Sequence, residues 1–300
     1  MKIAIIGLGD IAQKAYLPVL TQLENVELTF CTRNLETLVR LSTQYRVDRI
    51  YQDYRDLNKS NIDAVMVHTS TASHPMIAAY FLQQGIPAFV DKPLADNAFD
   101  CEKLYELAEQ HKVPLYMGFN RRFIPLYEAC LLPDKLMSLR WEKNRFDLPG
   151  ELRNFVFDDF IHPLDSVNIY AKANIADINI ISQFKGAKLG RLDLQWQQND
   201  VLLHASMNRL HGITNEIVSF NYENCSYQFD SFVSGKKLQG NQQTSLNIAD
   251  WTPMLASKGF TAMIEDWLRV VVAGKLETET IERNLASHQL AEAICQKIAE

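Results

Sequence analysis

Short apolar runs alternate with longer amphipathic stretches from residue 1 to about residue 120. The apolar runs predict strands at Lys2–Ile6, Val26–Cys31, Arg49–Tyr51, Ala64–His68, Ala88–Asp91 and Leu115–Gly118. Between them, apolar positions three and four residues apart predict helices at Asn34–Tyr45, His74–Gln84 and Asn97–His111. Unbroken apolar strands are typical of parallel sheets whose two faces are covered. The first half is therefore predicted to be a doubly wound parallel α/β sheet.

The pattern changes after about residue 125. A helical stretch near 160–172 is predicted among strands at 135–145, 177–184, 190–197, 201–209 and 215–231. Two helices, Phe260–Val272 and Ile281–Ala299, close the chain, and the last helix could pack back on the first domain. We therefore predict domains at 1–122 and 123–300, the second an α+β domain on a mostly antiparallel open sheet with helices on one face.

Composition excludes several classes of protein. The chain has 300 residues, 47% of them hydrophobic, and a formal net charge of -6 without a basic stripe, so we expect a folded protein that binds no nucleic acid. Neither a secretory signal nor an apolar run of ~20 residues is present, which predicts a cytoplasmic protein without a membrane partner. The five cysteines form no C-x-x-C pair, so we expect reduced thiols and no metal site.

The first predicted strand runs directly into a glycine-containing loop. Its sequence is Gly7-Leu8-Gly9-Asp10-Ile11-Ala12, a G-x-G-x-x-A run that opens a predicted helix. Gly7 suits a tight turn, Gly9 lets the backbone approach a pyrophosphate, and Ala12 allows close packing of helix on strand. This pattern predicts a Rossmann dinucleotide-binding domain, with the cofactor at Gly7, Gly9, Asp10, Ile11 and Ala12. The alternative is a glycine turn in another α/β protein.

The end of the second strand bears on which nicotinamide cofactor is bound. An acidic residue there would bind the ribose 2′-hydroxyl of NAD, whereas an Arg accommodates the 2′-phosphate of NADP. This chain has Thr32 and Arg33 and no carboxylate at that point. The sequence therefore favours NADP, with NAD as the alternative if Arg33 only stacks on the adenine.

Three further segments follow later strands. They are Thr69-Ser70-Thr71-Ala72-Ser73-His74, Asp91-Lys92-Pro93-Leu94 and Gly118-Phe119-Asn120-Arg121-Arg122-Phe123. With the glycine loop, they resemble in order and spacing the motifs G-x-G-x-x-G/A, T-P-x-x-x-H, E-K-P and G-x-x-R-R of the Gfo/Idh/MocA oxidoreductases, and within them the MviM-like oxidoreductases. In the second domain, the segment from Asp158 through His162 to Asp165 is similar to the family's D-x-x-x-H-x-x-D.

The resemblance implies an NAD(P)-dependent dehydrogenase or reductase that acts on a sugar, cyclitol or similar small polyol, working as a homodimer or homotetramer. It gives Lys92 the role of reaching the reacting oxygen. His162 is the candidate general base, because its ordinary pKa of about 6.5 suits neutral pH, and Asp158 would orient it or bind a hydroxyl. Cofactor contacts are further expected at Thr69, Ser70, Thr71, His74, Lys92 and Asn120. Substrate contacts are expected at Lys92, Asn120, Arg121, Asp158, His162 and Asp165.

Other interpretations of these residues stay open. Lys92 could be an exposed lysine at a strand end, Asp158 or Asp159 a helix N-cap, and His162 a hydrogen-bonded core residue. His74 could begin a helix. Pro163 departs from the family pattern and suggests that a helix begins near it, which weakens the expectation that Asp158, His162 and Asp165 share a face. Arg122 could equally be a packing or ion-pair residue. Residues expected to be scaffold more often than pocket are Arg209, His211 and Trp251.

Two other functions remain at this point. Some relatives of the fold cleave glycosides through transient oxidation of a ring carbon by a tightly retained cofactor. A nucleotide-binding regulator without catalysis is the third class, and the presence of Lys92, Asp158 and His162 argues against it.

Overall fold

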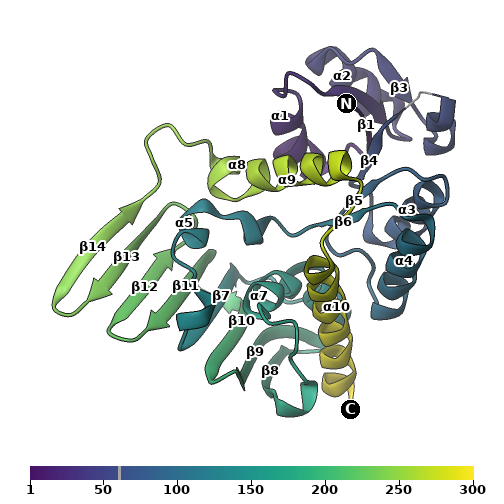
Figure 1. Cartoon of the computed structure of the whole chain (residues 1–300). Coiled ribbons are helices and arrows are strands. Elements are labelled where there is room, and N and C mark those ends of the chain that lie inside the picture. The colour runs from purple at the N-terminus through teal and green to yellow at the C-terminus, as the bar shows by residue number, and fades with distance from the viewer. Residues whose placement is uncertain (60–61) are drawn as a thin grey trace. The chain divides into compact units, whose positions relative to one another are not determined.

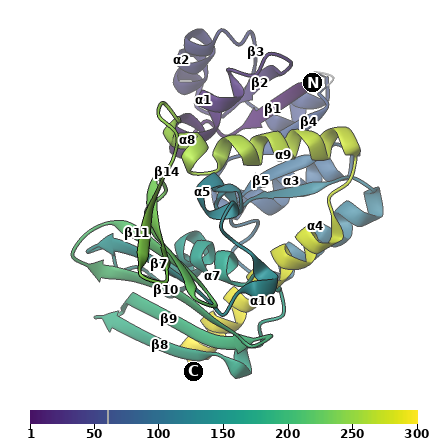
Figure 2. The ribbon, with the colours of Figure 1, turned by 60° about the vertical axis from the view of Figure 1, so that its left-hand side comes forward.

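The computed structural model describes residues 1–59 and 62–300, with the side chains of residues 58 and 59 also left undescribed. The chain forms two compact units. One comprises Met1–Phe119 and Phe260–Thr278, and the other comprises Asn120–Gly259 and Glu279–Glu300. Each unit contains one sheet (Figures 1 and 2).

The first unit contains a six-stranded parallel sheet in the order β3-β2-β1-β4-β5-β6. This is the strand order of the Rossmann fold and confirms the predicted doubly wound sheet. The strands are β1 (Lys2–Ile6), β2 (Glu27–Cys31), β3 (Arg49–Tyr51), β4 (Ala64–Val67), β5 (Ala88–Asp91) and β6 (Leu115–Gly118). Every residue of β4, β5 and β6 is buried, as the unbroken apolar runs in the sequence predicted.

The helices of this unit begin and end at residues with recognisable capping chemistry. Asn34 and Asn97 each accept a hydrogen bond from the backbone N–H three residues later, which caps two helices. Gly85, at φ +74°, follows a third helix. The elements are η1 (π-helix, Ala12–Tyr16), α1 (Leu17–Leu20), α2 (Leu35–Tyr45), η2 (Tyr54–Lys59), η3 (Thr71–Ser73), α3 (His74–Leu82), α4 (Ala98–His111) and α9 (Phe260–Ala273).

Helix α9 belongs to the first unit although it lies near the end of the sequence (Figure 2). Trp267 is fully buried, and its ring centroid lies 6.0 Å from that of Phe89 and 5.6 Å from that of Tyr116. The Tyr116 hydroxyl donates to the Asp266 carboxylate at 2.8 Å. Helix α9, which precedes the last helix in the sequence, thus carries the apolar face that completes this core. The packing of the last helix on the first domain stays a prediction.

The second unit contains an eight-stranded sheet in the order β14-β13-β12-β11-β7-β10-β9-β8. All neighbours are antiparallel except β7 and β10, which confirms the predicted mostly antiparallel open sheet. The strands are β7 (Ser138–Phe146), β8 (Asn179–Lys185), β9 (Lys188–Gln198), β10 (Val201–His211), β11 (Asn215–Tyr222), β12 (Cys225–Asp230), β13 (Ser234–Gln239) and β14 (Gln242–Asn247). The single strand predicted at 215–231 is a hairpin, and β13 and β14 were not predicted.

Helix α7 packs on β7 and β10. The helical elements of this unit are η4 (Asn120–Phe123), α5 (Pro125–Glu128), η5 (Pro133–Lys135), α6 (Leu152–Asn154), η6 (π-helix, Phe155–Phe160), α7 (Ile161–Val167), η7 (Ile175–Asp177), α8 (Met254–Ser257) and α10 (Thr278–Ala299). Within residues 1–59 and 62–300, no helix is long and apolar enough to cross a membrane.

Candidate functional site

The glycine loop after β1 has the conformation that the motif requires. Gly7 has a φ of +90°, and a Cβ atom there would lie 2.8 Å from the backbone carbonyl carbon and oxygen of His68. A Cβ atom on Gly9 would meet no atom within 4 Å. The N–H of Gln13 bonds to the Gly9 carbonyl oxygen at 3.1 Å, so helical hydrogen bonding starts at this glycine. Gly7 is thus needed for the fold of the loop, whereas Gly9 leaves space in front of it.

A pocket of about 640 Å³ opens at this loop and lies within the first unit. Its volume falls in the ordinary range for small-molecule sites. Eight of the residues predicted to bind the cofactor line it, namely Gly7, Gly9, Asp10, Ile11, Thr32, Arg33, Thr69 and Ser70. Lining residues that were not predicted include Gln52, Tyr54, His68, Ser73, Met76 and Ile77.

The lining residues fit a dinucleotide. The free space at Gly9 accepts a diphosphate close to the backbone, at the start of a helix whose first N–H groups favour anions. Arg33 is exposed at the edge of the pocket, and its guanidinium makes no ion pair with the described residues. The carboxylate in the lining is Asp10, which pairs with Lys14 at 2.8 Å.

The remaining predicted cofactor residues lie elsewhere. Ala12 is fully buried, in keeping with its expected packing role. His74 is buried too, with Nδ1 2.9 Å from the Pro93 carbonyl oxygen and Nε2 3.0 Å from the Thr69 carbonyl oxygen. This ring joins the loops that follow β4 and β5. The Asn120 amide, in the second unit, donates to the carbonyl oxygen of Lys258 at 2.8 Å.

Lys92 follows a strand whose last residue, Asp91, is buried. The Asp91 carboxylate accepts from the Lys92 N–H at 2.9 Å and from the Tyr16 hydroxyl at 3.1 Å. Burial raises the pKa of Asp91, and the nearby charges of Lys92 and His74 oppose that effect. Lys92 itself is half-buried, and its peptide bond to Pro93 is cis. The surroundings of Lys92 thus include a buried carboxyl group and a buried phenol.

Tyr16 and His68 form a buried ring pair next to Asp91, with centroids 3.9 Å apart. Neither ring nitrogen of His68 has a hydrogen-bond partner among the described residues. Burial lowers the pKa of His68 to about 3, and the neighbouring His74 acts in the same direction. Burial also raises the pKa of Tyr16 well above 10.0, and the Asp91 carboxylate adds to the effect. Both rings are therefore uncharged at neutral pH.

In the second unit, His162 lies on a helical segment that runs without interruption from α6 through η6 into α7. The prediction that a helix begins near Pro163 is wrong. Pro163 has no N–H to give to the Asp159 carbonyl oxygen four residues earlier, and the Lys143 ammonium donates to this oxygen at 3.3 Å instead. The π-helical turn of η6 also shifts the period, so that Asp158 is exposed while His162 and Asp165 are buried.

The two carboxylates next to His162 have charged partners of their own. Asp165 accepts from Arg122 at 2.5 and 2.9 Å and from the Ser287 hydroxyl at 2.8 Å, which ties α7 to η4 and α10. Asp159, the neighbour of the predicted site residue Asp158, pairs with the buried Lys143 and with Arg209. Arg122 is thus an ion-pair residue, as one interpretation of the sequence had it.

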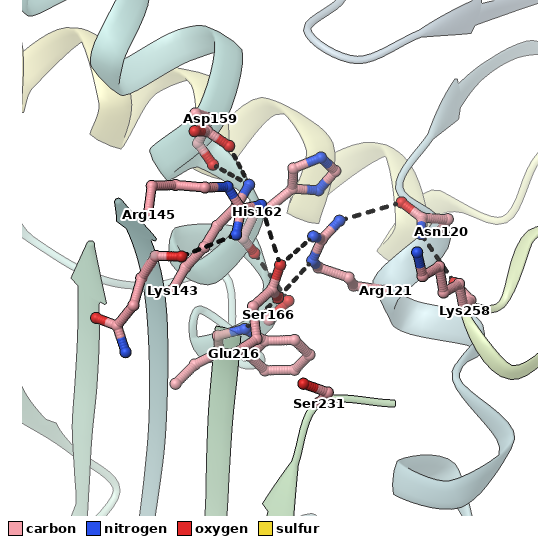
Figure 3. Close-up of polar contacts among 12 residues, drawn as sticks. Asn120, Arg121, Lys143, Arg145, Asp159, His162, Ser166, Glu216, Ser231 and Lys258 are labelled. Atoms are coloured by element: carbon pink, nitrogen blue, oxygen red, sulfur yellow. Dashed lines mark hydrogen bonds and ion pairs between the residues drawn. The ribbon is translucent and has the colours of Figure 1, made fainter. Parts of the chain in front are cut away.

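Figure 3 shows a cluster of charged side chains in which His162 and Arg121 lie together with Lys143, Arg145 and Glu216. Lys143, Arg145 and Glu216 were not predicted as site residues. The signal that would have found Lys143 and Arg145 is the alternation along β7, where they follow the buried Trp141 at steps of two and so share its face of the sheet. Glu216 is their neighbour on β11, where it pairs with Lys143 in the register.

Comparison with known proteins is consistent with this architecture. Residues 1–119 match the family model described as "Oxidoreductase family, NAD-binding Rossmann fold". The oxidoreductase YceM of Salmonella typhimurium is 31% identical over 300 residues, covering 98% of this chain and 97% of that protein. An inositol 2-dehydrogenase of Salmonella paratyphi B is 27% identical over 281 residues, covering 89% of this chain and 80% of that protein.

Two solved structures are similar over the whole chain. A Gfo/Idh/MocA family oxidoreductase from Vibrio cholerae has a TM-score of 0.98 and 58% identity, covering 100% of this chain and 98% of that one. The dehydrogenase MviM from Clostridium difficile has a TM-score of 0.91 and 25% identity, covering 99% of each chain. From the match of its first 119 residues to this family model and its similarity to these relatives over nearly its whole length, the chain belongs to the Gfo/Idh/MocA family and is an NAD(P)-dependent oxidoreductase.

Proposed function

We propose that this enzyme transfers a hydride between NADP and a hydroxyl or carbonyl carbon of a sugar, cyclitol or similar small polyol. The observation that carries the proposal is the pocket at the glycine loop, whose lining includes Thr32 and Arg33. The similarity to an inositol 2-dehydrogenase supports the polyol class. A bound nicotinamide supplies the hydride acceptor or donor.

Lys92 is proposed to hold the reacting oxygen. A lysine cation stabilises the negative charge that develops on an alcohol oxygen as the oxygen loses its proton, before hydride leaves the carbon. Asp91 and Tyr16 support this role, because the buried carboxylate fixes the backbone N–H of Lys92 and is itself held by the phenol. Both are positioning residues in this proposal, since they act through Lys92.

For the proton, we propose His162 as the general base. An imidazole suits proton transfer at neutral pH, and the Ser166 hydroxyl donates to the His162 backbone carbonyl at 2.8 Å, which steadies the helical turn that carries the ring. Asp158, which is exposed one turn earlier, is proposed to bind a substrate hydroxyl.

Replacement of Lys92 tests the mechanism. We expect Lys92→Met to abolish turnover in a screen of polyols, aldoses and keto-sugars with NADP(H), followed by the absorbance of the reduced nicotinamide, and to leave NADPH affinity within about twofold. The matched control is Lys103→Met, which alters an exposed lysine on α4 and should leave turnover unchanged. Turnover by the Lys92 variant would remove this lysine from the mechanism.

The preference for NADP is tested by titration. We expect NADPH to bind more tightly than NADH, and Arg33→Gln to weaken NADPH about tenfold while leaving NADH unchanged, because only the former carries a 2′-phosphate. Arg40→Gln is the control, since Arg40 is also exposed and bonds to Gln13. Equal affinities for the two cofactors would reject the preference.

We further propose that the enzyme is a homo-oligomer. Ile181, Leu202 and Ile217 lie on strands of the second sheet with side chains 58%, 43% and 38% exposed, and such apolar surface favours association. Light scattering coupled to size exclusion would give the mass, and a monomer at micromolar concentration would reject the proposal.

A further inference from the structure

Two carboxylates, Glu216 and Asp159, share a group of side chains with His162, and each pairs with two cations. Glu216 of β11 accepts from Arg121 Nε at 3.0 Å and from its terminal nitrogen at 2.5 Å. Its second cation is Arg145, whose nearest nitrogen lies 3.6 Å away. Trp141 Nε1 also donates to Glu216, at 3.1 Å. Glu216 is thus held firmly by Arg121 and Trp141 and only loosely by Arg145.

Asp159 of η6 forms the second arrangement. It accepts from the Lys143 ammonium and, through its other oxygen, from Arg209 at 2.8 Å. Lys143 is 2% exposed and Arg209 is 9% exposed. The Nε of Arg209 is buried and has no hydrogen-bond partner among the described residues. The single negative charge of Asp159 is therefore the counter-charge of two buried cations, Lys143 and Arg209.

The two arrangements form one cluster (Figure 3). Lys143 and Glu216 are directly paired residues of neighbouring strands. Arg121 lowers the pKa of Glu216 to about 2 against the effect of burial, and Lys143 and Arg209 likewise lower the pKa of Asp159, so both carboxylates are ionised at neutral pH. Four cationic side chains thus face two negative charges.

This excess of positive charge persists whichever form Lys143 takes. Burial lowers the pKa of Lys143 to about 7, with Asp159 acting in the opposite direction. The three arginines stay protonated, so the cluster carries at least one net positive charge. A buried charge without a counter-charge is costly, and a bound anion removes that cost.

Arg145 is the member best able to take a further anion. Its side chain is 25% exposed, whereas those of Arg121 and Arg209 are 11% exposed. Its contact with Glu216 is the longest in the cluster, and another of its nitrogens donates to a backbone oxygen at 2.9 Å. The proposed base, His162, lies in the same group of side chains.

We propose that the substrate of this enzyme is a polyhydroxy compound with an anionic group, a carboxylate or a phosphate, which binds Arg145 in the cluster of Arg121, Lys143, Arg145 and Arg209. The inference rests on the proposed function, because it specifies the substrate class of that reaction. It also explains why the cluster retains more cations than its two carboxylates neutralise.

Calorimetric titration of the full-length protein at low ionic strength tests this inference. The probes are gluconate and glucose 6-phosphate, with glucose and myo-inositol as uncharged counterparts, each titrated with and without NADPH. We expect at least one anionic probe to bind at least tenfold more tightly than the uncharged ones. Preference for gluconate identifies a carboxylate as the recognised group, and preference for glucose 6-phosphate identifies a phosphate.

Two variants locate the binding. Arg145→Gln should weaken the anionic probe about tenfold, a loss of one charge-assisted interaction, while Arg145→Lys should retain most of the affinity. Arg140→Gln is the matched control, because Arg140 is exposed on the same strand and pairs with Glu142, and it should change nothing. Thermal unfolding checks that each variant is folded, which is expected because Glu216 keeps Arg121 and Trp141.

Different results would contradict the anionic-substrate inference and the proposed function. Equal binding of charged and uncharged probes, anion binding that Arg145→Gln leaves unchanged, or no binding of either anion would overturn the inference and leave the cluster as a structural ion-pair network. Failure of NADPH to bind in its own titration would instead reject the proposed function, while the comparison of probes without NADPH would still stand.

Discussion

At the scale of single residues, two glycines of one loop are constrained in different ways. Gly7 adopts a left-handed φ of +90° against the backbone of His68, so any side chain there strains the loop. Gly9 faces open space, so a side chain there disturbs only what binds in that space. Stability and cofactor affinity should therefore respond separately to the two positions.

We expect Gly7→Ala to lower the free energy of unfolding by roughly 2–5 kcal/mol, the combined cost of a strained φ and overpacking. Gly9→Ala should change it by less than about 0.5 kcal/mol but weaken NADPH binding about tenfold or more, because the methyl group occupies the space that a diphosphate needs. Urea denaturation and NADPH titration measure the two effects. Similar behaviour of both variants would contradict this assignment.

His68 links stability to pH. Its folded pKa of about 3 lies below its ordinary value of 6.5, so the unfolded chain binds a proton in acid that the folded chain does not. The contribution of His68 to the free energy of unfolding is therefore fully present above pH 6.5, and it is lost as the pH falls from 6.5 towards about 3. His288, whose pKa burial lowers to about 4, acts in the same direction.

We expect His68→Phe to reduce the loss of unfolding free energy between pH 7 and pH 5 by about 2 kcal/mol, the linkage for one such histidine over that range. Urea denaturation at the two pH values measures it. His111→Gln, at an exposed position, serves as control and should show the pH dependence of the parent protein. An unchanged slope for His68→Phe would mean that the buried ring is not neutral.

Residue patterns predicted some of these positions and missed others. Gly7, Gly9 and Lys92 were found because the backbone of a nucleotide loop and a strand-end lysine leave local signatures. Asp159 and Asp158 are adjacent, and only the π-helical turn of η6 decides which of them meets Lys143. Glu216 and Arg121 are 95 positions apart in sequence, and their pairing follows from the tertiary packing of η4 beside β11, which local patterns do not specify.

At the scale of elements, Asp165 holds three of them together. Its carboxylate binds Arg122 of η4 and Ser287 of α10, and Arg283 lies 3.7 Å from it. The arginines keep the pKa of Asp165 lowered although the group is buried. Removing the negative charge would leave cations buried beside it, which is more damaging than losing an exposed pair.

We therefore expect Asp165→Asn to lower the free energy of unfolding by about 3–5 kcal/mol, the usual effect of breaking a buried pair. Asp147→Asn is the control, because its partner Lys185 and Asp147 itself are both more than half exposed, and it should cost less than about 0.5 kcal/mol. Chemical denaturation followed by circular dichroism measures both. Equal stability of the two variants would show that Asp165 does not anchor α7.

The sequence predicted the strands of the first unit more completely than those of the second. The six strands of the parallel sheet were all predicted, and β4, β5 and β6 gave the clearest apolar runs because both of their faces are covered. In contrast, β13 and β14 are largely polar and partly or fully exposed, so they lack the alternation that marks a half-buried strand. Their pairing comes from consecutive hairpins rather than from burial.

At the scale of the whole molecule, the two units are not contiguous in sequence. Residues 260–278 return to the first unit, and Trp267 of α9 fills a core formed by Phe89 and Tyr116. A single boundary at residue 122 was predicted, because the sequence of an amphipathic helix does not indicate which sheet the helix packs on. The domain functions assigned to 1–122 and 123–300 stay predictions.

We expect Trp267→Ala to cost about 3–5 kcal/mol of stability, the usual effect of removing a large buried side chain. Trp251→Ala is the matched control, since that side chain is 99% exposed, and it should leave stability nearly unchanged. Urea denaturation distinguishes them. A small effect at Trp267 would mean that α9 contributes little to the first unit.

The position of α9 also has a consequence for biosynthesis. The last strand of the parallel sheet ends at residue 118, yet the helix that completes its core starts at residue 260. At ordinary translation rates, on the order of ten seconds pass between the two on the ribosome. During synthesis, the segment Met1–Phe119 therefore lacks α9, and the rings of Phe89 and Tyr116 stay incompletely covered until nearly all of the polypeptide has been made.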